Sequence, residues 1–211
     1  MIATARSLLA ILVGIASISS GLYGSDLASR EGAVFVMTNA ADKNEIVAYQ
    51  RAADGTLYKA DRFETGGRGS GGVTDPLESQ GSLSLSQDRS LLFAINAGSG
   101  TVSVFRVHDA YLSLRDEAPS GGSEPVAVTQ RGNLVYVLNT GGSGSIVGFR
   151  LTRDGRLTEI LNSTVFLTAN VTGGASIAIS PDGNFLVVTE RLANNIDTFR
   201  IKPDGLWHRL L

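Results

Sequence analysis

The sequence predicts an all-β fold, a β-propeller built of four-stranded antiparallel blades. Three features recur along the chain and carry this prediction: an apolar run that ends in a polar residue, a second run closed by an aromatic residue, and an aspartate turn. The apolar runs are 34–39, 91–96, 134–139 and 185–190, the aromatic residues are Tyr49, Phe105, Phe149 and Phe199, and the aspartates are Asp54, Asp109, Asp154 and Asp204. Short strands repeated about every 40–50 residues indicate one sheet per repeat.

Two further strands complete most blades. An inner strand in which small and aliphatic residues alternate is predicted at 82–86, 125–129 and 176–180. An outer strand follows each aspartate, at 56–63, 111–117, 156–161 and 206–211. The predicted blades are therefore about 33–63, 82–117, 125–161 and 176–211, and the first of them lacks its inner strand.

This strand order predicts two different faces of the molecule. The segments that enter the inner strands and the turns that follow the second strands share one face, which we call the loop face. It carries the long glycine-rich connections 65–81, 120–124 and 168–175, and long loops on a rigid scaffold are where function is usually found. The aspartate turns lie on the opposite face, called the turn face.

Residues 1–24 have the layout of a secretory signal peptide. Arg6 precedes a largely apolar run at 7–18, and small residues follow it. We expect cleavage between Ser20 and Ser25, a partial propeller domain over 25–211, and a protein that is secreted, or periplasmic if bacterial, with no membrane attachment after cleavage. The alternative is an uncleaved anchor, for which the apolar run is short.

Composition excludes several function classes. The chain has 18 basic and 20 acidic residues without a basic stripe, which argues against a nucleic-acid partner. It has no cysteine, so a disulfide framework, a thiolate nucleophile and a cysteine zinc site are excluded. The G-x-G-x-x-G string at 67–72 precedes no helical pattern and is predicted to be a loop, not a dinucleotide site. His108 and His208 fall at peripheral positions, and we expect no metal and no cofactor.

Several motifs together resemble a known family. The chain is similar over about 33–205 to the lactonase-type seven-bladed β-propellers, which include 6-phosphogluconolactonase-like and carboxymuconate-cyclase-like proteins. The motifs that carry the resemblance are 121–125, 134–139, 180–183, 187–190 and 196–200. The resemblance implies lactone hydrolysis or cycloisomerisation of a small sugar-acid lactone or a related carboxylate. A non-catalytic extracellular propeller that binds a protein or glycan through its loop face is the alternative.

The resemblance also implies a site. Family members place acidic, Arg and His side chains in a funnel at one end of the channel, and Glu190 matches one of these residue types. We expect Glu190 and Arg191 to be catalytic, because a carboxylate beside a cation is able to orient a lactone or polarise its carbonyl. Asn96 and Asn139 are expected to bind substrate.

Structural readings of the same residues remain open. Glu190 is alternatively a strand-end cap in place of the asparagines, and Asn39, Asn96 and Asn139 are alternatively turn formers. Three loop acids, Asp75, Glu78 and Glu124, match no calcium-loop spacing.

The number of strands leads to an expectation about the whole molecule. Four blades of the family's seven, with one inner strand missing, predict an open arc. Its end blades expose apolar faces, which favours association or poor solubility. The oligomeric state itself is not predicted.

Overall fold

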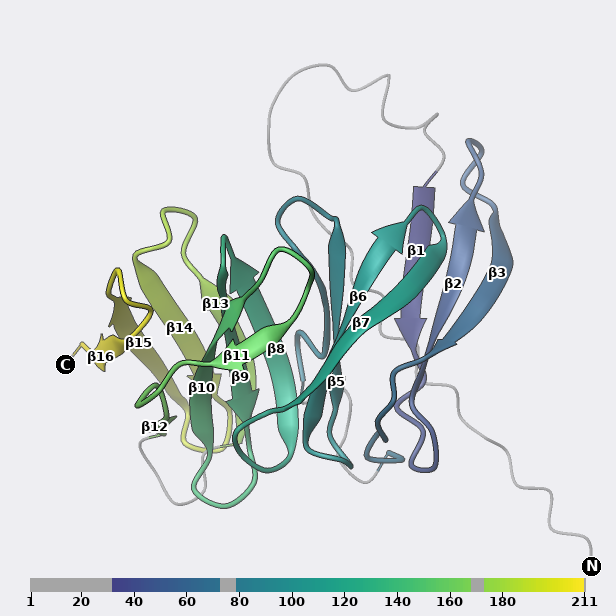
Figure 1. The fold of residues 1–211 in the computed structure, drawn as a ribbon. Helices are drawn as coiled ribbons and strands as arrows, with labels where there is room; N and C mark the ends of the chain where they lie inside the picture. The colour runs from purple at the N-terminus through teal and green to yellow at the C-terminus, as the bar shows by residue number, and fades with distance from the viewer. Residues whose placement is uncertain (1–31, 73–78, 168–172, 211) are drawn as a thin grey trace, which may run out of the picture.

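The computed structural model describes residues 32–72, 79–167 and 173–210. All regular structure in these residues is β-strand, arranged as four antiparallel sheets that stand side by side like the blades of a fan (Figure 1). The predicted fold class is confirmed. Among these residues no helix is long and apolar enough to span a bilayer. The predicted signal peptide, Asp75 and Glu78 lie outside the described residues.

The first two sheets follow the predicted order of strands. The first has three strands, β1 (Gly32–Met37), β2 (Glu45–Arg51) and β3 (Leu57–Glu64), and no inner strand among the described residues. The second has four strands, β4 (Leu83–Leu85), β5 (Leu91–Asn96), β6 (Thr101–His108) and β7 (Tyr111–Pro119).

The third sheet contains a short strand that the sequence did not predict. It consists of β8 (Pro125–Arg131), β9 (Leu134–Asn139), β10 (Ser145–Leu151), β11 (Leu157–Glu159) and β12 (Val165–Phe166). The outer strand ends at Glu159, because a turn follows in which Asn162 has a φ of +61°. The chain then returns as β12, which pairs Val165 with Ile146 and so covers the part of β10 that β11 leaves unpaired.

The fourth sheet follows the predicted pattern and lies at the other end of the fan from the first (Figure 1). Its strands are β13 (Gly174–Ile179), β14 (Phe185–Glu190), β15 (Asn195–Ile201) and β16 (Trp207–Arg209). They lie in the order β13-β14-β15-β16, from the inner to the outer edge.

Strand pairing corrects the alignment of the first repeat by one residue. The repeated aromatics Tyr49 and Phe105 lie opposite Val34 and Leu92. Val34 therefore matches Leu92 rather than Leu91, and Thr38, not Asn39, matches Asn96. The sequence misplaced this register because residues 33–37 are apolar without interruption, and only a two-residue alternation fixes a strand's register.

The core lies between neighbouring sheets. In β5, Leu92 and Ala94 pack in the cluster shared with the first sheet, whereas Leu91 and Phe93 pack in the cluster shared with the third. Consecutive side chains of a strand point to opposite faces, so a sheet between two others buries both faces. This explains why the central strands are continuous apolar runs instead of alternating ones.

Candidate functional site

Backbone hydrogen bonds at the loop face join each turn after a second strand to the segment that enters the inner strand. Gly98 N donates to Arg68 O at 3.0 Å in the second sheet. Gly141 N donates to Ser123 O at 3.0 Å in the third, and Arg191 N donates to Gly173 O at 2.9 Å in the fourth. The two sets of segments therefore share one face, as the strand order predicted.

Asn96 ends β5 and is fully buried, with an exposed fraction of 0%. Its Oδ1 accepts a hydrogen bond from Asn44 Nδ2 at 2.9 Å. Its Nδ2 donates to Thr101 Oγ1 at 3.0 Å and to Ser103 Oγ at 2.8 Å. The amide thus ties the first sheet to the second, and in this conformation both of its polar atoms are used within the protein.

Asn139 holds the same position in the third sheet but is bonded less well. It is also fully buried, and its Nδ2 is 3.4 Å from Ser120 O and 3.5 Å from Ser145 Oγ. Within the described part of the chain, its Oδ1 has no hydrogen-bond partner. A buried carbonyl without a donor costs about 1–3 kcal/mol, so this amide stabilises the fold less than Asn96 does.

The three asparagines differ in backbone conformation. Asn39 has a φ of +52°, and its side chain is hydrogen-bonded to Ser70. Asn96 and Asn139 are not among the residues with positive φ. Asn96 ends its strand and also starts the turn at 97–100, because its carbonyl accepts a hydrogen bond from Gly100 N at 2.9 Å.

Glu190 takes the same position in the fourth sheet and is 1% exposed. It ends β14 with its Cα opposite those of Gly174 and Asn195. Arg191, the next residue, is exposed. The structure therefore places Asn96, Asn139 and Glu190 at equivalent strand ends on one face.

The sequence did not single out Asp197, which lies on the same face of the fourth sheet as Glu190. Asp197 is 5% exposed, and its Oδ2 lies 3.0 Å from Nη2 of Arg209. Asn195 Nδ2, directly across from Glu190, donates to Asp197 Oδ1 at 3.1 Å. An acid inside a strand of apolar and β-branched residues was the signal that could have identified it, because acids are almost never fully buried unless they are paired.

Glycines of the loop face lie directly on the strand-end amides. A Cβ atom on Gly67 would lie 2.5 Å from Asn96 Cγ, and one on Gly122 would lie 2.6 Å from Asn139 Cγ. The segment 67–72 is a loop, as predicted, and its first glycine is required by close approach to Asn96 rather than by a phosphate.

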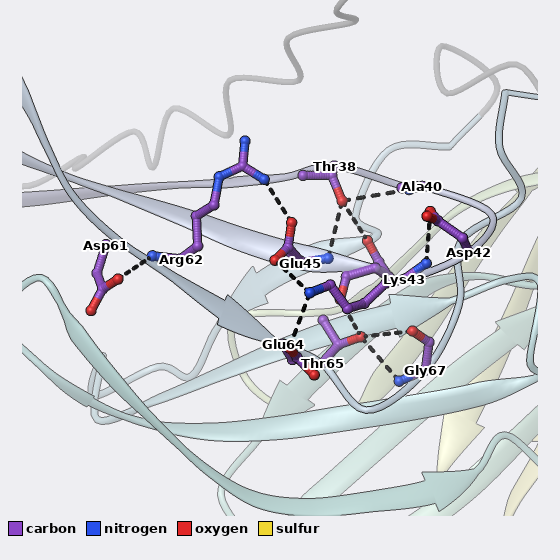
Figure 2. A network of polar contacts seen from close by, with 11 residues as sticks. Thr38, Ala40, Asp42, Lys43, Glu45, Asp61, Arg62, Glu64, Thr65 and Gly67 are labelled. Atoms are coloured by element: carbon purple, nitrogen blue, oxygen red, sulfur yellow. Dashed lines mark hydrogen bonds and ion pairs between the residues drawn. The ribbon is translucent and has the colours of Figure 1, made fainter.

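A charged network borders the loop face at the first sheet (Figure 2). The Glu45 carboxylate lies 2.6 Å from Arg62 Nη1 and 3.4 Å from Lys43 Nζ, which is also 3.0 Å from Glu64. Burial raises the pKa of Glu45, but hydrogen bonds from Arg62 and Lys43 outweigh it and lower the pKa overall. The hydrogen bonds to Glu64 and Glu45 raise the pKa of Lys43. Lys43 and Arg62 are about half-exposed, so solvent screens these ion pairs and they stabilise the fold little.

The other candidate residues are exposed, and Glu124 lies beside the strand end of Asn139, where its carbonyl accepts a hydrogen bond from Thr140 N at 3.0 Å. His108 ends β6 and His208 lies in the outer strand β16, and both are exposed. Glu124 is an exposed loop residue with a φ of +52°. In 32–72, 79–167 and 173–210, no three His, Cys, Asp or Glu residues are grouped so that they could hold a metal ion.

Comparison with known proteins identifies relatives of this arrangement. The family model "Lactonase, 7-bladed beta-propeller" matches residues 143–208, which contain Glu190, Arg191 and Asp197. No curated protein matches the chain.

Solved structures match over most of the chain. A Lactobacillus plantarum protein matches with a TM-score of 0.67 at 18% identity, covering 85% of this chain and 52% of its own. A candidate 6-phosphogluconolactonase from Bacteroides fragilis has the same TM-score and identity, with coverages of 85% and 50%. The periplasmic gluconolactonase PpgL of Pseudomonas aeruginosa matches with a TM-score of 0.51 at 17% identity, with coverages of 85% and 68%.

The chain spans about half the length of the first two structures. At such low identity the likeness shows the fold alone. The resemblance seen in the sequence is confirmed: the chain is similar to the lactonase-type seven-bladed β-propellers, by the family model in residues 143–208 and by fold across the described sheets.

Proposed function

We propose that the protein is a lactonase-like β-propeller that acts on a small sugar-acid lactone or a related carboxylate. The observation that carries the proposal is the burial of Glu190, at 1% exposure, where two other sheets place a neutral asparagine. Burying a carboxylate costs far more than burying an amide. Since an amide fills this position in the second and third sheets, retention of a carboxylate in the fourth favours a chemical role.

The proposed chemistry divides between the two adjacent residues. Glu190 acts as a general base that takes a proton from the water attacking the lactone carbonyl. Arg191 provides a positive charge for the oxyanion that develops on the carbonyl oxygen. The low exposure of Glu190 means that the substrate reaches it only after the segments above the strand end move, as active-site loops do in many enzymes.

Asn96 and Asn139 are proposed to bind the hydroxyl groups of the substrate in that opened state. In the described structure their amides face protein groups beneath Gly67 and Gly122. Of the two, Asn139 is better suited, because its Oδ1 has no donor among the described residues.

The test is hydrolysis of a panel of sugar lactones by the complete protein and by the Glu190→Gln variant. Turnover should fall by roughly 10²–10⁴-fold, the usual contribution of general-base catalysis. Glu159→Gln makes the same chemical change at an exposed position of the outer strand β11 and should leave turnover unchanged. No turnover by the native protein, or equal turnover by Glu190→Gln, would refute the catalytic role.

A second function has an observation in its favour. The amide of Asn96 is fully used in contacts that hold sheets together, as a structural role requires. This supports the alternative of a non-catalytic propeller that binds a protein or glycan through its loop face. Binding of an extracellular glycan or protein by material that is inactive on every lactone would favour it.

Export belongs to the same proposal. The layout of residues 1–24 supports it, and one structural neighbour, PpgL, is a periplasmic protein. We propose that the protein acts outside the cytoplasm, without membrane attachment after cleavage.

A further inference from the structure

Glu190 and Asp197 share the face of the fourth sheet that packs on the third sheet. Val188 and Phe199 belong to the core cluster between these two sheets. Glu190 lies two residues after Val188 in β14, and Asp197 lies two residues before Phe199 in β15. Residues two apart in a strand point to the same side. Both carboxyl groups are therefore directed toward the third sheet, and they are 1% and 5% exposed.

The second sheet shows that side chains at these two positions meet. Asn96 and Ser103 hold in β5 and β6 the places that Glu190 and Asp197 hold in β14 and β15. Asn96 Nδ2 donates to Ser103 Oγ at 2.8 Å. The same register therefore brings two carboxyl groups beside each other in the fourth sheet, where the second sheet has an amide and a hydroxyl.

Asp197 is held in place by two donors. Arg209 of the outer strand β16 has its Nη2 3.0 Å from Asp197 Oδ2, and the same nitrogen donates to Phe166 O at 3.1 Å. Asn195 Nδ2 donates to the other carboxylate oxygen at 3.1 Å. The guanidinium compensates the charge of Asp197, and Glu190 adds a second acid beside this ion pair.

The third sheet presents apolar residues to Glu190. Leu167 N donates to Gly144 O at 3.1 Å, as Thr65 N donates to Asn44 O at 3.0 Å in the first sheet. A glycine and a leucine of the third sheet therefore take the places of an asparagine and a threonine of the first. Apolar surroundings disfavour the charged form of a carboxyl group, so this side of the site favours a proton on Glu190.

The other charged side chains near this site are exposed. Among the described residues at the loop ends of the third and fourth sheets, they belong to Arg191 and Glu124. The positive charge of Arg191 opposes the effect of Asp197 on Glu190. Solvent screens exposed charges more than buried ones, so the buried Asp197 has the larger influence.

We propose that Glu190 and Asp197 form a coupled acid pair in which Asp197 sets the pH at which Glu190 becomes a base. The inference rests on the proposed function, in which Glu190 takes a proton from water. Two adjoining carboxyl groups do not both ionise readily, because like charges at close range repel. Asp197, compensated by Arg209, carries the charge first, and Glu190 keeps its proton up to a higher pH.

This arrangement suits a general base, which works best when it titrates near the operating pH. The proton of the pair leaves Glu190 for solvent before the reaction. The carboxylate then accepts one proton from the attacking water, whose oxygen bonds to the lactone carbonyl carbon. Asp197 touches no reacting atom in this scheme and acts only through Glu190.

Carbon-13 NMR of the Glu190 side-chain carboxyl in the full chain tests the pair without requiring turnover. The signal is identified by its absence from the Glu190→Gln spectrum. Its titration midpoint should lie above the ordinary range of a glutamate and should fall by about one pH unit or more in Asp197→Asn, because a neighbouring negative charge is lost. Arg209→Gln removes a positive charge and should raise the midpoint.

The two opposite shifts separate this role from a structural one. Loosened packing would admit water and lower the midpoint in both variants. Asp61→Asn is the matched control, because it makes the same change at an exposed position of β3 and should leave the midpoint unchanged.

The pH dependence of kcat/KM on a lactone gives the functional readout. Its acid limb should follow the NMR midpoint, to lower pH in Asp197→Asn and to higher pH in Arg209→Gln. A Glu190 midpoint that is equal in the native chain and Asp197→Asn, or that moves the same way in both variants, overturns the proposal with or without turnover. The predicted NMR shifts in a protein inactive on every lactone would support the acid pair and refute the lactonase function.

Discussion

At the scale of residues, one strand-end position carries different side chains in successive sheets. It is Thr38 in the first sheet, Asn96 and Asn139 in the next two, and Glu190 in the fourth. The sequence showed that a polar residue ends each strand, and it placed Glu190 in the series. The burial and hydrogen bonding of these side chains could not be predicted, because they depend on residues far along the chain. Asn96, for example, accepts a hydrogen bond from Asn44.

The two buried asparagines should differ in their effect on stability. Asn96→Ala removes three hydrogen bonds of a fully buried amide, two of them to the buried side chains of Asn44 and Ser103, so the free energy of unfolding should fall by about 2–3 kcal/mol. Asn139→Ala removes two long hydrogen bonds and also one unpaired carbonyl, so its loss should be about 1 kcal/mol or less. Denaturant unfolding of both variants measures the difference, and equal losses would contradict the assignment.

At the scale of elements, the sheets are positioned by the segments between them. The glycine-rich connection 65–72 crosses from the first sheet to the second and bonds to both, through Gly69 N to Ala40 O at 2.7 Å and Arg68 O to Gly98 N at 3.0 Å. Glycine is needed at Gly67 because the backbone passes directly over the Asn96 amide. The glycine content predicted loops here. Only the folded structure shows at which glycines a neighbouring group leaves no room for a Cβ atom.

Replacing Gly67 by alanine tests this contact. The added methyl would lie 2.5 Å from Asn96 Cγ and 2.6 Å from Ser99 Oγ, and such overpacking typically costs about 1–3 kcal/mol. Gly32→Ala is the matched control, because a Cβ there would meet no atom within 4 Å. Thermal unfolding should show a lower midpoint for Gly67→Ala and an unchanged or slightly higher one for Gly32→Ala.

At the scale of the whole molecule, four sheets stack in a fan whose first and last members have one neighbour each among the described residues (Figure 1). The sequence predicted this open arc from the count of strands. Between inner sheets, arginine side chains of one sheet donate to turn carbonyls of the next, as Arg106 does to Arg153 O and Arg150 to Asp204 O.

The predicted export of the whole protein has a direct test. Arg6, the apolar run at 7–18 and the small residues after it lead us to expect a mature N-terminus between Ser20 and Ser25. N-terminal sequencing of protein recovered from outside the cytoplasm measures it. Intact Met1 in a membrane fraction would instead support the uncleaved anchor.

The sequence by itself determined the β-propeller class, the order of strands within each blade and the face on which the loops gather. It could do so because apolar runs, aromatic closures and turn residues act locally and repeat. The tertiary structure decided the register of the first repeat, the extra strand β12, the pairing of Asp197 with Arg209 and the use made of each strand-end amide. These depend on which side chains meet across sheets, and that is set by packing between segments tens of residues apart, such as Arg150 with Asp204.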